Sequence, residues 1–124
     1  MLTSEWAMNV STQWCDAWNK RDIDALMALY ADDAELNSPL VAKRWGVAHG
    51  WIRGKEHLRK NFEIGMQTPG MYFTLEHVLL GQRSFCIFYT RENGTRVCDL
   101  FELNEMNQLL RVVACHAPPN TAKL

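Results

Sequence analysis

The sequence lacks the segments that would place the chain in or across a membrane. Its first residues, MLTSEWAMNVSTQW, contain no basic stretch and no apolar run of signal-peptide length, so we expect no signal peptide. The longest clearly apolar stretch is Phe85–Tyr89, which has the length of a strand and falls well below the roughly 18 residues of a membrane span. We therefore predict a cytoplasmic protein with no membrane partner.

An excess of charge of one sign is also missing. Thirteen Lys and Arg stand against fourteen Asp and Glu, for a net charge of −1. A nucleic-acid module would carry a basic excess, so we expect no nucleic-acid partner. Hydrophobic residues make up 48% of the chain, which is typical of a folded protein and not of a disordered one. The length of 124 residues allows one domain, which we assign to residues 1–117, with a flexible tail at 118–124.

Metal-binding spacings are absent as well. The four cysteines form no CxxC pair, and no His or Cys ligands lie at short spacing, so we expect free, buried thiols, no metal and no cofactor. Aromatic residues, by contrast, are abundant. Five Trp, five Phe and three Tyr exceed what a core of this size requires, which raises the question of where they lie.

The first half of the chain predicts three helices. Apolar residues recur at spacings of three and four from Trp6 to Trp18, after a possible N-cap at Ser4. Asp22 can cap a second, short helix. A third helix is expected after Gly54, where apolar residues are spaced by four.

The remaining segments predict strands. Residues 34–38 alternate as a short strand that Pro39 ends, and residues 40–53 read as a loop with an extended piece. Four antiparallel strands are expected at 71–80, 83–91, 95–103 and 109–116. The order predicts an α+β fold in which three N-terminal helices pack on the concave face of a cone-shaped, curved antiparallel sheet.

The dipeptide Asn93-Gly94 suggests the register of the central hairpin. A two-residue turn there pairs Phe88 with Asp99, and directly paired residues point to the same face. Val97, Phe101 and Leu103 share the face of Asp99, so we expect this face to meet the helices. The opposite face is also apolar and has no second cover within the chain, which predicts a homodimer through that outer face. Its expected contact residues are Phe85, Ile87, Tyr89, Cys98 and Leu100.

Asp99 is the main candidate for chemistry. A carboxyl among apolar side chains prefers to be neutral, so its pKa should rise, and it could act as a general acid or as a hydrogen-bond donor to a carbonyl oxygen. Two other interpretations remain open. A register slip of one residue would turn Asp99 outward, or neighbouring hydroxyls could satisfy it within the core.

Several motifs resemble the nuclear transport factor 2-like superfamily, which is also called SnoaL-like. They are "WNKRD" at the end of the first helix, then "ALYADDAEL", "RGKEHLRKNF" and the antiparallel meander. The resemblance implies a cone-shaped α+β barrel with a deep apolar pocket, and commonly a dimer. It is specific for fold and poor for function, because this fold carries isomerases, cyclases, hydrolases, dehydratases and non-catalytic binders.

Ketosteroid isomerases are the closest enzymatic comparison. The segment "VCDLFELN" resembles their strand with the donor Asp, which places Asp99 on that match. Ser38 stands where these enzymes have the catalytic base, and Trp14 stands where they have a donor Tyr. Steroid isomerisation is therefore not expected. Limonene-type epoxide hydrolysis is poorly supported as well, because the strand 83–91 offers no inward carboxylate.

Other residues complete the predicted site. His116 is expected on the inner face of the last strand near the open end of the pocket, where it could exchange protons with Asp99, although a solvent-exposed strand end is an equal alternative. The predicted substrate-binding residues are Trp14, Trp18, Tyr30, Ser38, His49, Phe62, Phe88 and Phe101. The aromatic members could instead simply fill the core.

These features lead to two hypotheses for function. The first is a cofactor-free acid–base enzyme of the isomerase, cyclase or dehydratase type, acting through Asp99 on a small hydrophobic or cyclic molecule. The second is a non-catalytic dimer that binds a small apolar ligand. The near-zero net charge favours an uncharged ligand in either case.

Overall fold

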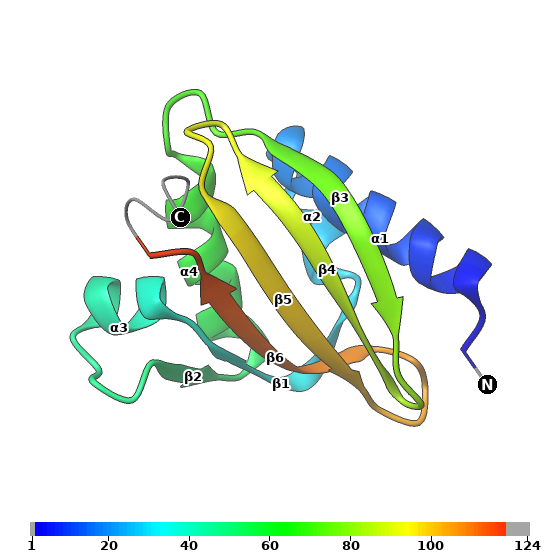
Figure 1. Cartoon of the computed structure of the whole chain (residues 1–124). Helices are drawn as coiled ribbons and strands as arrows, with labels where there is room; N and C mark the ends of the chain where they lie inside the picture. The colour runs from blue at the N-terminus through cyan, green and yellow to red at the C-terminus, as the bar shows by residue number, and fades with distance from the viewer. Residues whose placement is uncertain (1, 119–124) are drawn as a thin grey trace.

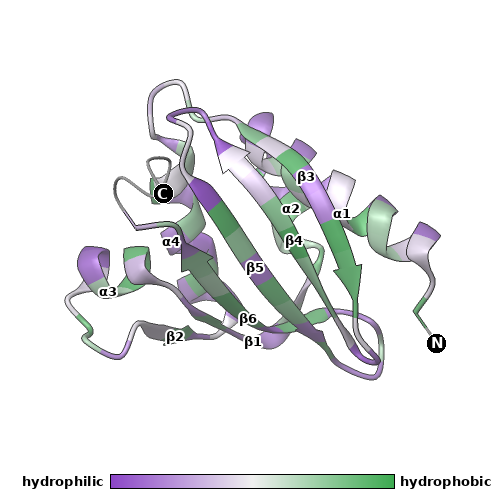
Figure 2. Ribbon diagram, viewed as in Figure 1, coloured by the Kyte–Doolittle hydropathy of each residue, from purple (hydrophilic) through white to green (hydrophobic). Residues whose placement is uncertain are grey.

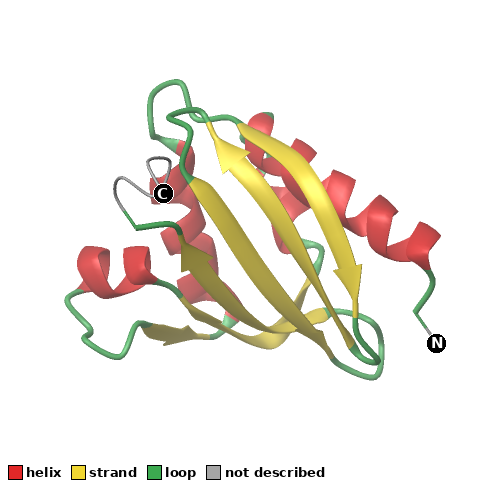
Figure 3. Cartoon of the chain, viewed as in Figure 1, coloured by secondary structure: helices red, strands yellow, loops and turns green. Residues whose placement is uncertain are grey.

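The computed structural model describes residues 2–118, and most of the predicted tail lies outside them. These residues form ten helices and strands, which Figures 1 and 3 show in place. They are α1 (Ser4–Asn19), α2 (Ile23–Met27), β1 (Tyr30–Asn37), α3 (Pro39–Trp45), β2 (Trp51–Arg53), α4 (Lys55–Met66), β3 (Phe73–Leu80), β4 (Ser84–Arg91), β5 (Arg96–Leu103) and β6 (Leu109–His116).

The helices begin where polar side chains can satisfy free backbone N–H groups. The Thr3 hydroxyl accepts from the N–H of Trp6 at 3.1 Å and caps α1, one residue before the predicted Ser4. Asp22 caps α2 as predicted, because its carboxylate accepts from the N–H of Ala25 at 3.1 Å. Both helices, together with α4, lie across one face of the sheet (Figure 1).

A fourth helix, α3, occupies part of the segment expected to be a loop. Ser38 caps it by accepting from the N–H of Leu40 at 3.1 Å, and Pro39 sits in the first turn, where its missing N–H costs nothing. Gly46 ends it in the left-handed region, with φ at 67°. The extended piece expected in this segment is β2.

The sheet is curved and unclosed, with strand order β2-β1-β6-β5-β4-β3. The predicted α+β class, with a cone-shaped sheet and helices on its concave face, is confirmed. One pairing differs from the wholly antiparallel expectation. Strand β1 lies parallel to β6, joined by pairs such as Leu36 with Val112.

The central hairpin is shifted by one residue from the predicted register. Ile87, not Phe88, lies opposite Asp99. The turn has three residues and not two, because the N–H of Arg91 donates to the carbonyl of Thr95 at 2.8 Å and Gly94 takes a φ of 83°. This is the turn plus glycine bulge that three-residue hairpins adopt. Asp99 nevertheless faces inward, since the slip affects β4 alone.

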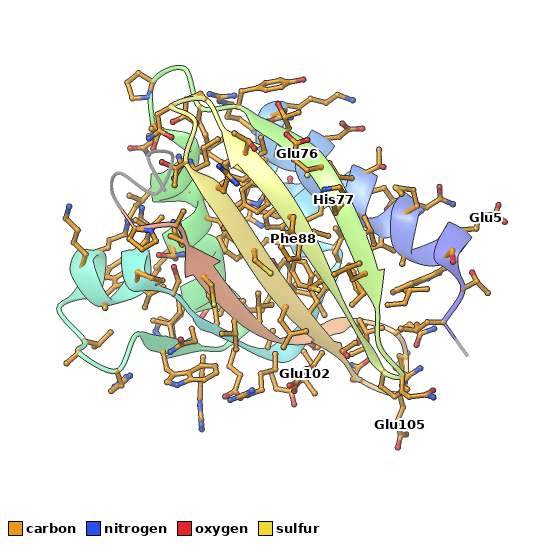
Figure 4. All side chains as sticks on the ribbon, viewed as in Figure 1. Glu5, Glu76, His77, Phe88, Glu102 and Glu105 are labelled. Atoms are coloured by element: carbon orange, nitrogen blue, oxygen red, sulfur yellow. The ribbon has the colours of Figure 1, made fainter. Side chains whose placement is uncertain are left out.

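The shift corrects the predicted dimer surface. Phe85, Ile87 and Tyr89 face the helices and are buried, so they cannot form the outer face. Figure 4 shows Phe88 with His77 on the side of the sheet away from the helices, where their rings pack edge to face. On this outer face, β4 and β5 present Cys86, Phe88, Cys98 and Leu100.

The core lies between the sheet and the three covering helices. In β5, hydrophobic stretches lie on both sides of a hydrophilic position in the middle of the strand (Figure 2). The largest fully buried side chains include Tyr30, Phe85 and Phe101. The cysteines are free, but they are not all buried, because Cys115 is exposed. Within residues 2–118, no helix is long and apolar enough to cross a membrane. The cytoplasmic location stays a prediction.

Candidate active site

A cavity of about 70 Å³ lies between the helices and the inner face of the sheet. Its inner wall consists of almost fully buried side chains, among them Trp14, Tyr30 and Asp99. Its other end is lined by the half-buried side chains of Arg44, Arg91 and His116. We call this second end the mouth. This volume limits the size of the ligand. An apolar cavity that encloses benzene measures about 150 Å³, so the cavity as it stands holds a molecule smaller than benzene.

Aromatic rings occupy most of the space inside the cone. Trp14 lies within 6.0 Å, between ring centroids, of Trp18, Phe73, Tyr89 and Phe101. Its Nε1–H donates to the Tyr30 hydroxyl at 3.0 Å. The predicted residues Trp14, Trp18, Tyr30 and Phe62 all line the cavity. Phe101 packs behind Trp14 and is not in the wall, so part of the aromatic surplus is core filling.

Trp18 reaches the cavity because α4 carries a glycine opposite it. A Cβ at Gly65 would lie 3.2 Å from two ring carbons of Trp18, which is tighter than an ordinary contact. The indole is 7% exposed, and its Nε1–H has no hydrogen-bond partner. The ring therefore brings an unsatisfied donor to the cavity wall.

Asp99 lies in the same wall, on β5. It is 4% exposed, and its Oδ1 has no hydrogen-bond partner. Burial raises the pKa of Asp99 to about 7, because a carboxylate without water or a partner is disfavoured. The prediction of a raised pKa and an inward side chain agrees with this geometry. Neighbouring hydroxyls do not satisfy the carboxyl, which excludes one of the sequence alternatives.

His116 and Ser38 line the same cavity as Asp99. Asp99 pairs directly with Ala114, and His116 lies two residues further along the same face of β6. Burial, helped by the positive charge of Arg91, lowers the pKa of His116, so the imidazole is neutral at pH 7. Ser38 lines the cavity, while Asn37 turns away and donates to the His49 carbonyl at 2.8 Å.

Two predicted residues do not belong to this cavity. Phe88 is 39% exposed on the outer face, because the hairpin register differs by one residue from the expected one. His49 is exposed in the loop before β2, where its Nδ1 accepts from the N–H of Trp51 at 3.0 Å. His49 is therefore not among the residues that line this cavity.

Sequence reasoning did not identify the two arginines at the mouth. Arg91 ends β4, and the observed register turns it to the same face as Tyr89. Arg44 comes from α3, where its Nη1 donates to the Asn61 side chain at 2.7 Å. A signal for Arg91 was present, because the set 85, 87 and 89 is more apolar than 84, 86 and 88 and so predicts the inner face. Arg44 had no such signal.

Unsatisfied polar atoms converge on this cavity. Among residues 2–118, three buried side-chain atoms lack a hydrogen-bond partner, and they belong to Trp18, Arg91 and Asp99. All three residues line the cavity. Buried polar groups are nearly always paired in folded proteins, so this coincidence marks the cavity as a place for a polar ligand. No group of three metal-binding side chains occurs in the described part of the chain.

Comparisons with known proteins agree on the family. Residues 11–112 match the family model of the SnoaL-like domain. A SnoaL-like protein of unknown function from Burkholderia thailandensis is 28% identical, with a TM-score of 0.88, over 95% of this chain and 100% of that chain. No protein with curated annotation matches the sequence significantly.

More distant solved structures share the fold. A nuclear transport factor 2-like protein of unknown function from Cytophaga hutchinsonii is 15% identical, with a TM-score of 0.71, over 95% of this chain and 96% of that one. SalBIII, described as an epoxide hydrolase/cyclase-like enzyme in pyran ring formation in the polyether salinomycin, is 18% identical. Its TM-score is 0.73, over 94% of this chain and 95% of that one.

Proposed function

We propose that this chain, which belongs to the SnoaL-like domain family, is a cofactor-free acid–base enzyme that transfers protons on a small carbonyl compound. One observation carries the proposal. The buried carboxyl of Asp99 faces a cavity with an unpartnered oxygen. A bound ligand would supply the hydrogen-bond partner that the protein does not.

Asp99 would act as the acid. With a pKa raised to about 7, a large fraction of the carboxyl carries a proton at neutral pH. A protonated Asp99 can donate to a carbonyl oxygen and stabilise the negative charge that develops there on enolisation. Tyr30 provides a second donor in the same wall. Its oxygen already accepts from the Nε1–H of Trp14, so its own proton is available.

His116 would act as the base. Its imidazole is neutral because its pKa is lowered, and it lies on the same face of β6 as Ala114, the residue that pairs with Asp99. In the forward step, a C–H bond next to the carbonyl breaks, its proton goes to His116, and the electron pair forms the C=C bond of an enol. Asp99 gives its proton to the oxygen. When the compound is a β,γ-unsaturated ketone, the enol is a dienol. Asp99 takes back the proton on oxygen as the C=O bond re-forms, and His116 delivers its proton to the γ-carbon, so the C=C bond moves into conjugation and the compound is isomerised.

Family resemblance is consistent with this class of chemistry. SalBIII, which shares the fold, is described as cyclase-like, and ring closure also needs a proton donor and a proton acceptor. The small cavity instead favours a second candidate, a non-catalytic ligand-binding protein. About 70 Å³ is well below the roughly 300–1,000 Å³ of typical ligand pockets, so a ligand larger than a few atoms must displace side chains at the mouth.

Hydrogen–deuterium exchange at carbon separates the two candidates. The wild-type protein is incubated in D₂O with cyclohexanone, 2-cyclohexenone and acetylacetone, and loss of the α-proton NMR signals is followed over time. We expect exchange above the buffer rate for at least one compound, and a drop of roughly 10²–10⁴-fold in Asp99→Asn. Glu102→Gln, an outer-face carboxyl on the same strand, is the control and should exchange normally.

Each outcome of this assay decides between the candidates. Exchange that survives in Asp99→Asn at the wild-type rate would refute the role of the carboxyl. A wild-type protein that binds these compounds but never exchanges their protons would favour the non-catalytic candidate.

A further inference from the structure

Two guanidinium groups line the mouth of the cavity. Arg44 comes from α3 and Arg91 from β4, and the neutral His116 of β6 lies in the same lining. Burial is the main cause that lowers the pKa of Arg44 and of His116, and the charge of Arg91 lowers both further, so the three groups lie near one another. Two carboxyls are near. Glu92 lies 3.5 Å from Arg91 Nε, and Asp99 lies in the inner wall.

Two buried donors of the residues that line this cavity have no hydrogen-bond partner. Arg91 Nε forms an ion pair with Glu92 Oε1 at 3.5 Å but makes no hydrogen bond. Trp18 Nε1 is also buried and unpartnered. Leaving a buried donor unsatisfied costs about 1–3 kcal/mol. Both residues line the same cavity, so a ligand that carries hydrogen-bond acceptors there would meet these donors.

Arg44 is held in place for such an acceptor. Its Nη1 donates to both oxygens of Asn61, at 2.7 Å to Oδ1 and 3.2 Å to the backbone carbonyl. Asn61 Oδ1 also accepts from Trp45 Nε1 at 3.1 Å. Asn61 is uncharged, so the guanidinium is oriented while its charge remains unneutralised. That combination suits an anion supplied from outside.

We propose that the substrate of this site carries a carboxylate, which Arg44, Arg91 and the Trp18 indole bind at the mouth while the reacting carbonyl faces Asp99. A planar carboxylate matches the paired N–H donors of a guanidinium. The proposal rests on the proposed function and deepens it, naming small keto acids as the substrate class. It replaces the expectation of an uncharged ligand, which considered only the net charge of the whole chain.

The ordering of charge in the cavity supports this orientation. A carboxylate placed beside an ionised Asp99 would be repelled, whereas the guanidinium groups of Arg44 and Arg91 line the mouth. Bound at the mouth, the ligand keeps its anionic end away from the apolar inner wall. The uncharged carbonyl group of the ligand can then reach the carboxyl of Asp99. The anion therefore fixes which end of the substrate meets the acid.

Binding of matched acids and amides tests the proposal. Levulinate, benzoate and cyclohexanecarboxylate are each compared with their own amide by calorimetry, at about pH 6, where Asp99 is mostly neutral. At least one acid should bind tenfold or more tightly than its amide. If every amide binds as well as its acid, the proposal is wrong. This comparison uses the wild-type protein and needs no variant to fold.

Variants then assign the effect to residues. Arg91→Gln and Arg44→Gln should each weaken acid binding about tenfold and leave amide binding unchanged. Arg91→Lys keeps the charge and should recover part of the loss, while Trp18→Phe keeps a ring, removes the N–H and should lose severalfold. Lys43→Gln removes an exposed charge next to Arg44 and is the control. An equal loss in Lys43→Gln would contradict the assignment.

The two proposals fail separately. If acids bind no better than amides but neutral ketones still exchange protons through Asp99, the carboxylate proposal fails and the acid–base function stands. If acids bind through the arginines and no exchange occurs, the site binds carboxylates without this chemistry.

Discussion

The two faces of the β4–β5 hairpin are made of similar residues but offer different chemistry. On the inner face, Ile87 lies opposite Asp99, and both are buried. On the outer face, Phe88 lies opposite Cys98, in a groove of about 580 Å³. The inner cavity is far smaller, at about 70 Å³. The pKa and hydrogen bonding of a side chain therefore depend here on whether water is excluded, and not on the volume of the groove or cavity.

The buried polar groups of the inner face mark the candidate active site. Asp99 has a raised pKa only because the inner face removes it from solvent. The unpartnered donors of Trp18 and Arg91 lie along the same cavity. The outer groove is larger, yet its open side gives polar groups access to water. The inner cavity, although smaller than the outer groove, is therefore the stronger candidate for catalysis.

Matched substitutions on adjacent residues of β4 test the two faces with the largest expected effect. Ile87→Asn places an amide in the core and should lower the free energy of unfolding by about 3–5 kcal/mol. Phe88→Asn removes a side chain that is 39% exposed and should cost about 1 kcal/mol. Urea denaturation of both variants measures the difference. The reverse order would restore the register expected from a two-residue turn.

On the outer face we expect a smaller effect, a rate of thiol labelling that depends on protein concentration. We propose that a second copy of the chain covers Phe88, Leu100 and their neighbours, because nothing within residues 2–118 covers this apolar sheet face. The free thiols of Cys98 and Cys115 lie opposite each other on neighbouring strands of this face. Cys115 is exposed, so it should react with a thiol reagent more slowly as protein concentration rises, because the dimer would cover it. Leu100→Glu should abolish that dependence.

Sedimentation of the same samples decides the assembly state. A single monomeric species, together with a labelling rate that does not depend on protein concentration, would refute the homodimer.

Local signals predicted much of the fold. Periodicity located α1 and α4, and the side chain of Asp22 located the start of α2. Alternation in β5 placed Val97, Asp99 and Phe101 inward, which the structure shows. These predictions succeed because each depends on a pattern within one element, where hydrophobic burial repeats with the period of the helix or strand.

Errors arose where two elements had to be aligned. The Asn93-Gly94 pair suggested a two-residue turn, but the stronger apolar set at 85, 87 and 89 governs the register and the turn takes a third residue. Arg91 reached the cavity only through that register. Arg44 depends on α3, a short helix whose start at Ser38 also ends β1. Patterns within a single helix or strand therefore could not place the two arginines at the cavity.

The central claim is that burial in the cavity keeps Asp99 partly protonated near neutral pH. Carbon-13 labelling of aspartate, with Asp99→Asn to assign the signal, allows its carboxyl carbon to be titrated by NMR in the folded protein. The account predicts a midpoint at about 7. A midpoint near the ordinary value of about 3.9 would show an ionised, solvated carboxylate and would contradict the proposed acid.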